Sequence, residues 1–592
     1  MKIYIAQMNV VQGKPALNFQ NIKKLVAEAE SKEASLVVFP ELCLSGILLG
    51  DLWNDSHFQE ECLEYGNKIA DLSLNVDIVF GNIGKYNGAL YNGVYHARAG
   101  KFLSILKNQE LELPFFPKVI SKDDFSSQYF SSFSTLLQKA QVSLSEMVKF
   151  QSNDSSEIVG YAFGNSYSNI QEIASLLRES KGKSKYLICL SANVFENNKR
   201  KRIYSEFMNL SKENEISLLY VNSVGMANQA KNIYALEGGS AVFSSKREQL
   251  EFKTFTAESL LWNSEEVSFV EKKSLSETNS DLSEIQEIKK ALVYMIRESL
   301  QRFGIRRVVI GASGGIDSAV SAALYAEAIG AENVFLVNMP TRFNSQTTQN
   351  AAKELAENLG SPYLVVPISK ILESVQTTLS ESCFERSAES LNVEGIHYEN
   401  LQARTRSGAV LATIASVLNA AFTCNGNKTE AMVGYCTLYG DTSGIICALG
   451  DLWKTQVYAL AKEINREKEI IPQASINIPA SAELSDAQNV DEGKGDPIIY
   501  PYHDKLFKYW MEEEKSITDT ENALHAGTLC KELNISHSYF ELLFSSKDKA
   551  LADMQQWWKR YKGIACAKRI QMPPILSVSK KAFGNSCQES QL

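Results

Sequence analysis

Apolar and polar residues alternate along the first half of the chain in segments whose spacing predicts strands and helices. Residues 19–32 place apolar side chains at helical spacing, and residues 34–42 form a short apolar run that is typical of a buried strand. The other apolar runs that predict strands in this half lie at 2–8, 76–84, 91–100, 185–192 and 217–225. Because helix-like stretches separate several of these runs, we expect a layered α/β domain that ends near residue 262.

The second half follows a more regular order. An amphipathic helix is predicted at 284–304, and the segments after it alternate between apolar runs and helical patterns. Strands are predicted at 306–312, 333–340 and 363–369, helices at 319–330 and 347–360, and a loop at 313–318. Short connections between alternating strands and helices predict parallel βαβ units, and therefore a doubly wound parallel sheet. Residues 263–283 are polar and rich in serine, so we expect domains 1–262 and 284–592 joined by this linker.

The overall composition excludes several classes of protein. The 592 residues are 44% hydrophobic and 22% charged, which excludes a largely disordered chain. The net charge is −9, which argues against a nucleic-acid partner because such proteins usually carry a basic face. The ten cysteines show no CxxC spacing, so we expect neither a zinc ribbon nor a disulfide scaffold.

Nothing in the sequence predicts a membrane partner. The most apolar stretch, residues 36–50, is interrupted by Pro40, Glu41 and Ser45 and is too short to span a bilayer. The N-terminus lacks the long apolar segment of a signal peptide. We therefore expect a soluble, cytoplasmic protein.

The sharpest local feature is the segment 313–318, which reads SGGIDS and lies between a predicted strand and a predicted amphipathic helix. Its glycines would let the backbone approach an anion closely, and its hydroxyl groups and the helix N-terminal amides could donate hydrogen bonds to phosphate oxygens. The segment lacks the GK[ST] ending of a Walker A loop. The alternative is an ordinary Gly-Ser turn at a helix start, but the placement between strand and helix favours a phosphate-binding loop.

This segment resembles the signature of the ATP pyrophosphatases, which cleave ATP between the α and β phosphates. Downstream segments resemble, in order, the motifs of one member, the NAD synthetases. They are ENLQAR at 399–404, GNKTE at 426–430, GYCTLYGD at 434–441, LWKTQV at 452–457, SAEL at 481–484, and AKRIQMPP and KKAFG near the end. The resemblance implies a domain of the adenine nucleotide alpha hydrolase-like fold that amidates deamido-NAD to NAD. The nicotinate carboxylate is adenylated by ATP with loss of pyrophosphate, and ammonia then displaces AMP.

The resemblance also implies roles for individual residues. Asp317, Lys454 and Ser481 would be catalytic, with Lys454 and Ser481 holding the pyrophosphate, and Asp317 and Glu430 would bind Mg²⁺. Asn425 stands where the family usually has threonine near ATP. The residues expected to bind ATP are Gly311, Ser313, Gly314, Gly315, Asp317, Ser318, Arg404 and Asn425, and those expected to bind deamido-NAD are Asn400, Glu430, Asp441 and Lys568.

Residues 1–262 resemble the nitrilase-like glutaminase domain, an α-β-β-α sandwich, that precedes the synthetase in glutamine-dependent NAD synthetases. The segments that carry this resemblance are AQMNVVQGK at 6–14, LVVFPEL at 36–42, LYNG at 90–93, LSANVF at 190–195 and the region 220–243. That family hydrolyses glutamine with a Glu-Lys-Cys triad, in which Glu is the base, Lys stabilises the oxyanion and Cys is the nucleophile.

Only the first member of this triad is matched. Glu41 occupies the glutamate position, but the register places Glu110 at the lysine position and Gly164 at the cysteine position. The chain has no cysteine between Cys62 and Cys189, and glycine has no side chain that could form a thioester. We therefore expect the domain to be an inactive glutaminase and Glu41 to be a relic of the triad.

The expected activity is consequently ammonia-dependent NAD synthesis, with ammonia taken up free or delivered by a separate protein. Two alternatives stay open: a glutamine-dependent enzyme with an unrecognised nucleophile, and a non-catalytic scaffold paralogue. The intact SGGIDS, GNKTE and LWKTQV segments argue against the scaffold. Because nitrilase-fold domains of this family assemble into oligomers, we also expect a homo-oligomer.

Overall fold

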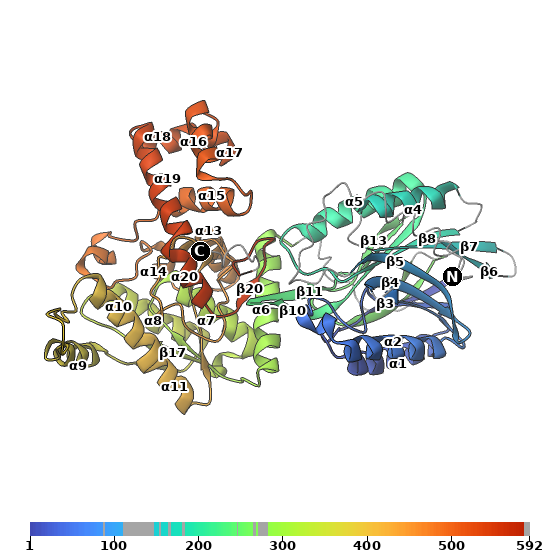
Figure 1. Ribbon diagram of the computed structural model, residues 1–592, viewed down its shortest axis with the longest axis horizontal. Coiled ribbons are helices and arrows are strands. Elements are labelled where there is room, and N and C mark those ends of the chain that lie inside the picture. The colour runs from blue at the N-terminus through green and yellow to red at the C-terminus, as the bar shows by residue number, and fades with distance from the viewer. Residues whose placement is uncertain are drawn as a thin grey trace. The chain divides into compact units, whose positions relative to one another are not determined.

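The computed structural model divides the chain into two compact units, shown in Figure 1. The first comprises Met1–Gln229 and Tyr234–Leu282, and the second comprises Ala230–Ile233 and Ser283–Leu592. The structure describes residues 1–86, 89–110, 147–152, 155–163, 167–179, 184–244, 247–264, 268–269 and 282–584. Among them, no helix combines the length and the apolar character needed to cross a membrane.

The first unit contains two sheets that lie between two pairs of helices (Figure 1). One sheet has the order β15-β14-β1-β2-β3-β4-β5 and the other has the order β13-β12-β9-β8-β7-β6. The strands of the first are β1 (Lys2–Gln7), β2 (Leu36–Val38), β3 (Asp77–Tyr86), β4 (Ala89–Arg98), β5 (Lys101–Glu110), β14 (Glu258–Asn263) and β15 (Ser268–Phe269). Those of the second are β6 (Met147–Ser152), β7 (Ser155–Phe163), β8 (Ser184–Ser191), β9 (Ser217–Asn222), β12 (Ala241–Ser244) and β13 (Arg247–Glu251).

Helices cover the outer face of each sheet, so the expected α-β-β-α sandwich is confirmed. Helices α1 (Pro15–Ser31) and α2 (Ser56–Asp71) pack on the first sheet, and α4 (Tyr167–Glu179) and α5 (Lys199–Asn214) pack on the second. Strand β1 illustrates why the strands read as continuous apolar runs. Ile3 and Ile5 belong to the core between the sheets, whereas Tyr4 and Ala6 belong to the core under α1. Alternate side chains of a strand point to opposite faces, and here both faces are buried.

A chain of polar groups crosses the core between the two sheets. The Tyr161 hydroxyl on β7 is 2.9 Å from Nδ1 of His96 on β4, and His96 Nε2 is 2.9 Å from Oδ2 of Asp77. Arg98 Nε donates to both carboxylate oxygens of Asp77. Burial lowers the pKa of His96, although Asp77 opposes this effect. These bonds satisfy polar groups that would otherwise be costly to bury between the sheets.

The second unit is built on a four-stranded parallel sheet of order β18-β17-β16-β19. Helix α7 packs against β16 and β17, while residues of α9 and α11 pack on Val309 and Val337 on the opposite face. The sheet is therefore covered on both sides, and the expected doubly wound parallel sheet is confirmed. The strands are β16 (Val308–Gly311), β17 (Val334–Asn338), β18 (Tyr363–Val365) and β19 (Ala421–Phe422). The helices are α6 (Glu284–Arg302), α7 (Ile316–Ile329), α8 (Gln346–Leu359), α9 (Ser369–Ser380), α11 (Ala412–Val417) and α13 (Lys454–Ile464).

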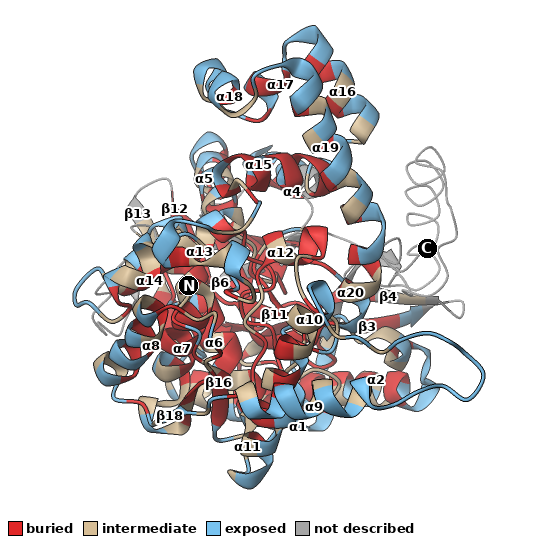
Figure 2. Cartoon of the chain, turned by 90° about the vertical axis from the view of Figure 1, so that its left-hand side faces the viewer, coloured by how far each residue is buried: buried red, intermediate tan, exposed pale blue. Residues whose placement is uncertain are grey.

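The C-terminal region adds a group of helices with its own aromatic core. Side chains of α15 (Tyr500–Met511), α18 (His537–Leu543) and α19 (Lys547–Lys562) form this core, including Tyr502, Phe507, Trp510, Phe540 and Trp557. Figure 2 shows that buried residues run along α15, whereas exposed residues make up a larger share of α16 (Ile517–Ala526) and α18. Helix α15 is thus the element of this group that is packed most deeply.

One sequence-based expectation is corrected by the structure. The segment 313–318 was expected to be a loop, but α7 begins at Ile316, so Asp317 and Ser318 lie in the first helical turn. A carboxylate in the first turn is favourable because the helix dipole presents positive charge there. Within the expected linker 263–283, Ser268–Phe269 forms β15, which pairs with β14. The other linker residues are described only at 263–264 and 282–283, and the C-terminal residues 585–592 lie outside the described part.

We predict that Tyr161→Phe weakens the first unit, because it removes a hydrogen bond to buried His96 while leaving the ring in place. The loss should be about 1–2 kcal/mol, as for a buried polar group that loses one partner. Thermal unfolding measured by circular dichroism should give a lower midpoint. A double-mutant cycle with His96→Ala should give a coupling energy that shows a stabilising interaction between the two side chains. Additive effects of the two substitutions would contradict the proposed link between the sheets.

Candidate active site

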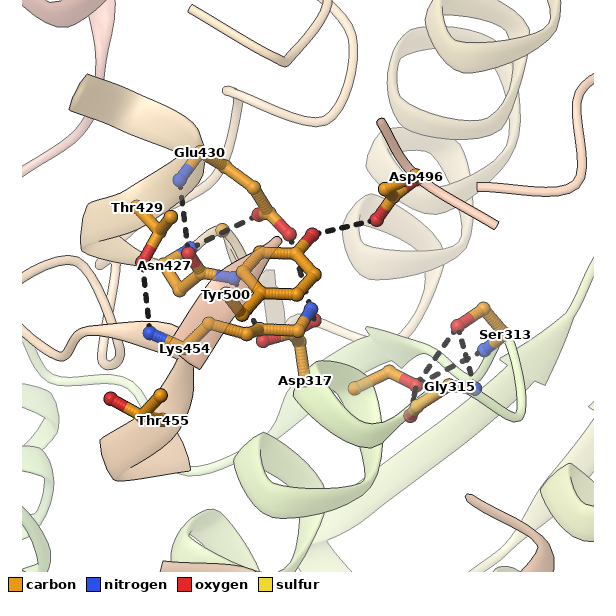
Figure 3. Close-up of polar contacts among 12 residues, drawn as sticks. Ser313, Gly315, Asp317, Asn427, Thr429, Glu430, Lys454, Thr455, Asp496 and Tyr500 are labelled. Atoms are coloured by element: carbon orange, nitrogen blue, oxygen red, sulfur yellow. Dashed lines mark hydrogen bonds and ion pairs between the residues drawn. The ribbon is translucent and has the colours of Figure 1, made fainter. Parts of the chain in front are cut away.

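The predicted phosphate loop connects the end of β16 to the start of α7 (Figure 3). Its own side chains close the turn: Gly315 N donates to Ser313 Oγ at 3.2 Å, and the hydroxyls of Ser313 and Ser318 are 3.1 Å apart. Ser318 Oγ also donates to the Gly315 carbonyl at 3.0 Å. Gly314 has φ +85°, and a Cβ there would lie 2.0 Å from the backbone oxygen of Thr348. Only glycine fits this position.

Beside the loop, one lysine lies between two carboxylates that come from distant parts of the chain (Figure 3). Lys454, at the start of α13, contacts Asp317 Oδ2 and lies 3.3 Å from Glu430 Oε1. Glu430 belongs to α12 (Lys428–Val433), and Asn427, which caps that helix, donates to Asp317 Oδ1 at 3.0 Å. The Lys454 side chain is 2% exposed, whereas those of Asp317 and Glu430 are 20% and 19% exposed. The carboxylates are therefore open to an incoming ligand, and the ammonium group lies behind them.

Burial and charge act against each other in this cluster. Burial alone would lower the pKa of Lys454, but the carboxylates of Asp317 and Glu430 raise it, so the ammonium group stays protonated. Burial raises the pKa of Glu430 above its ordinary value, and Lys454 opposes that rise. Tyr500 extends the cluster: its ring lies 5.2 Å from Lys454 Nζ, and its hydroxyl donates to Asp496 Oδ2 at 2.7 Å. Burial raises the pKa of Asp496 as well.

Three of the residues predicted to bind deamido-NAD form a second cluster around Thr437. The Thr437 hydroxyl donates to Asn400 Oδ1 at 2.9 Å, and its backbone amide donates to Asp441 Oδ1 at 2.6 Å. Lys568 Nζ donates to the carbonyls of Gly434 and Cys436 in the same segment. Burial raises the pKa of Asp441 to about 6, while the Thr437 amide and Lys568 lower it. Asp441 belongs to the segment 434–441, and Asn400 and Lys568 both contact that segment, so the structure brings the three residues together.

Other predicted site residues lie outside these two clusters and bond to nearby backbone or side-chain groups. Ser481 Oγ donates to the backbone oxygen of Gln488 at 2.7 Å, and Arg404 Nε donates to that of Leu438 at 3.2 Å. Asn425 accepts a hydrogen bond from the Thr423 hydroxyl at 2.9 Å. Gly311 ends β16, and a Cβ there would lie 3.3 Å from side-chain atoms of Leu411 and Met339.

Several residues of the site were not singled out from the sequence. Asn427 lies within the GNKTE segment, where its role as a helix cap could have been read from its position before α12. Arg406 lies two residues beyond ENLQAR and donates to the Met339 carbonyl and to Asn344 Oδ1, both at 3.2 Å. Burial lowers the pKa of Arg406 to about 10, although Glu483 opposes this. Neither Asp496 nor Tyr500 belongs to a segment that carried a resemblance, so no sequence signal identified them.

In the first unit, Glu41 begins the turn that follows β2, three residues after Val38, and is buried. Its Oε1 accepts a hydrogen bond from Asn92 Nδ2 at 2.5 Å. Burial raises the pKa of Glu41 to about 7, against the opposing effects of Asn92, the Ala192 backbone and Lys199. The backbone of Glu110 ends β5, and its side chain is outside the described part, as is the whole of Gly164. The substitutions at these two positions therefore remain predictions from the sequence register.

Comparison with known proteins assigns both halves of the chain. Residues 2–246 match the carbon–nitrogen hydrolase family, and residues 288–538 match the NAD synthase family. A glutamine-dependent NAD(+) synthetase from Synechocystis is 28% identical over 526 residues, covering 88% of this chain and 90% of the relative. One of the same name from Acinetobacter baylyi is 28% identical over 522 residues, covering 88% and 89%.

Two solved structures share the fold over nearly the whole chain. The glutamine-dependent NAD+ synthetase from Acinetobacter baumannii, in complex with ADP, is 22% identical with a TM-score of 0.65, covering 98% of this chain and 97% of that chain. The glutamine-dependent NAD(+) synthetase from Cytophaga hutchinsonii is 16% identical with a TM-score of 0.71, covering 98% and 95%. A carbon–nitrogen hydrolase domain at residues 2–246 is therefore followed by an NAD synthase domain at residues 288–538, and the relatives that match most of the chain are named glutamine-dependent NAD(+) synthetases.

Proposed function

We propose that this enzyme amidates deamido-NAD with ammonia in an ATP-dependent reaction, and that it does not hydrolyse glutamine. The observation that carries the ammonia proposal is the absence of any cysteine between Cys62 and Cys189, together with Gly164 at the nucleophile position. A glutaminase of this type needs a thiolate to form its acyl intermediate. The alternative, glutamine-dependent synthesis with an unrecognised nucleophile, is favoured by the names of the relatives at 28% identity.

The chemistry explains why a phosphate loop stands beside a buried lysine. A carboxylate becomes an amide at neutral pH only after its oxygen is converted into a better leaving group, which AMP supplies. The protein must then align the carboxylate with the α-phosphate and neutralise the charge that develops on pyrophosphate. Lys454 is charged and lies next to the loop, so we assign it, with Ser481, to the pyrophosphate. The remaining ATP contacts are assigned to Gly311, Ser313, Gly314, Gly315, Ser318, Arg404 and Asn425.

Asp317 and Glu430 are the residues that would hold Mg²⁺. Oxygens of both carboxylates converge on Lys454 Nζ, so the two side chains already share one cationic partner. Within the described residues, no group of three or more His, Cys, Asp or Glu side chains could hold a metal. A pair of carboxylates suits Mg²⁺ bound to a nucleotide, because phosphate oxygens and waters complete the shell. When bound, the ion would neutralise phosphate charge.

For the dinucleotide, the proposal uses the cluster around Thr437. Asn400, Asp441 and Lys568 would contact deamido-NAD, and Asp441 is held in place by the Thr437 amide. Although burial raises the pKa of Asp441 to about 6, that value lies below neutral pH, so the ionised carboxylate can orient a donor group of the substrate. We also propose that the enzyme is a cytoplasmic homo-oligomer. It would take up free ammonia or receive ammonia from a separate protein.

We predict that purified enzyme forms NAD and AMP with ammonium as nitrogen donor, and that glutamine does not replace ammonium. Gly164 cannot attack the amide, and Glu110 would repel the developing oxyanion. The measurement is NAD and glutamate formation with each donor, in protein freed of contaminating glutaminase. Glutamate released in step with NAD would refute the ammonia proposal while leaving the synthetase activity intact.

We predict that Asp317→Asn lowers the rate of NAD formation roughly a hundredfold or more, since it removes charge from a group that faces both Lys454 and the proposed ion. The matched control is Asp548→Asn, which makes the same change at an exposed position in the first turn of α19. Steady-state rates at saturating Mg²⁺ test this prediction. Activity within a few-fold of the wild type would remove Asp317 from the site.

We predict that Glu41→Gln changes the pH dependence of stability without changing ammonium-dependent synthesis. The folded carboxyl holds its proton up to about pH 7, whereas the unfolded one releases it near 4.5. Wild-type stability should therefore fall between about pH 4.5 and 7, and the glutamine variant should lack this contribution, with a gain of roughly 1–3 kcal/mol at pH 8. Unfolding midpoints of both proteins from pH 4 to 8 measure it. If the unfolding midpoints of both proteins changed in parallel with pH, or if the variant lost ammonium-dependent NAD synthesis, the proposed role of Glu41 would be wrong.

A further inference from the structure

The proposed function requires Glu430 and Lys454 to keep a fixed spacing, although they begin two different helices. Glu430 lies in the first turn of α12, and Lys454 is the first residue of α13. The Asn427 backbone amide donates to Glu430 Oε2 at 3.3 Å, and Asn427 Oδ1 accepts the Glu430 backbone amide at 3.0 Å. These contacts fix Glu430 within its own helix and leave open what fixes α12 relative to α13.

Thr429 and Asp504 connect the two helix starts. The Thr429 hydroxyl donates to Asp504 Oδ1 at 2.5 Å. It also accepts the backbone amide of Lys454 at 2.9 Å (Figure 3). The second oxygen of Asp504, Oδ2, accepts the backbone amide of Thr455 at 2.8 Å. We call these three hydrogen bonds the Thr429–Asp504 clamp. It joins the residue before Glu430 to the backbone of Lys454 and of the residue after it.

Every donor of the clamp has an acceptor within the clamp. A threonine hydroxyl has one proton, which goes to Asp504, and a lone pair that receives the Lys454 amide. An ionised aspartate only accepts, and its two oxygens meet one hydroxyl and one amide. Thr429 is fully buried and Asp504 is 4% exposed, so water does not readily replace a lost partner.

Asp504 is itself held by the C-terminal helices. It lies on α15, where the neighbouring His503 accepts the Ile499 amide at Nδ1 and lies 3.0 Å from Asp553 of α19 at Nε2. Tyr502 and Phe507 of α15 belong to the aromatic core that α19 completes. The clamp thus rests on a packed element and reaches from it to the two helices that carry the charged side chains.

We propose that Asp504 is a positioning residue that acts through Thr429 to set the spacing of Glu430 and Lys454, and with it the binding of the metal–nucleotide complex. This inference rests on the proposed function of the second unit. Neither Asp504 nor Thr429 touches the reacting groups, so their removal should loosen the site without removing a ligand. Partners that orient a ligand typically alter metal affinity or activity by about 10–100-fold when they are lost.

The test compares substitutions that remove or retain the Thr429 hydroxyl. Thr429→Val keeps the shape and loses the hydroxyl, and Thr429→Ser keeps the hydroxyl. The matched control is Thr520→Val, because Thr520 is also fully buried, accepts from Trp510 Nε1 at 2.8 Å and donates to the Ser516 carbonyl at 2.8 Å. The probe is Mn²⁺ with α,β-methylene-ATP, and electron paramagnetic resonance of free Mn²⁺ gives the affinity. The kcat and KM for ATP are measured in parallel.

We expect Thr429→Val to weaken Mn²⁺ binding about tenfold or more and Thr429→Ser to restore it to within about threefold. Thr520→Val should lower the unfolding midpoint and leave Mn²⁺ affinity unchanged. If Thr429→Val does not fold, Asp504→Asn takes its place: the amide offers one acceptor oxygen for two donors, so binding should again weaken.

Wild-type Mn²⁺ affinity in both Thr429→Val and Asp504→Asn would overturn the proposal, as would an equal loss in Thr520→Val. The result is separable from the proposed function. If the wild type formed no NAD from ammonium but its Mn²⁺ affinity depended on Thr429, the activity would be refuted and the clamp would stand. If the wild type formed NAD and the variants bound Mn²⁺ normally, only the clamp would fail.

Discussion

The ammonium group of Lys454 is almost completely buried, and it is tolerated there because Asp317 and Glu430 both face it. Taking a charge out of water is costly unless opposite charges and hydrogen bonds compensate for the lost hydration. The three residues come from α7, α12 and α13, so this requirement fixes three helix starts around one point. The phosphate loop is the beginning of the first of these helices, and its position is set by the same interaction.

A second buried ion pair supports the start of α12. Lys428 Nζ lies 2.9 Å from Asp451 Oδ1, and both side chains are fully buried. The other oxygen of Asp451 accepts the backbone amides of Val578 and Ser579 at 2.7 Å, and Lys428 also donates to the Lys581 carbonyl. The KKAFG segment near the C-terminus therefore supports the helix that carries Glu430. Its resemblance to a family motif has a structural basis, which the sequence alone did not suggest.

The sandwich of the first unit does not depend on the residues that the sequence register aligns with a glutaminase triad. Large apolar cores stabilise it, one between the sheets and one under each pair of helices. None of these cores depends on a triad side chain. A buried Glu41 with an elevated pKa is a cost to this unit, which Asn92 reduces by donating to the carboxyl group. Fold and catalytic triad can thus change separately, because packing energy and chemistry lie in different residues.

The sequence by itself determined the local structure and the order of the chemistry-bearing segments. Helical and strand periodicity located β1, α6, α7 and α8, and the SGGIDS segment marked the loop at the end of β16. The cysteine positions alone determined that no thiol lies between residues 62 and 189. Only the tertiary structure decided which side chains meet: Lys454 and Asp317 are 137 positions apart, and Thr429 and Asp504 are 75 apart. Periodicity reports which face of an element a residue occupies, but not which distant element packs there. The partners of buried charges depend on that packing, and so Asp496, Tyr500 and Asp504 became visible only in the fold.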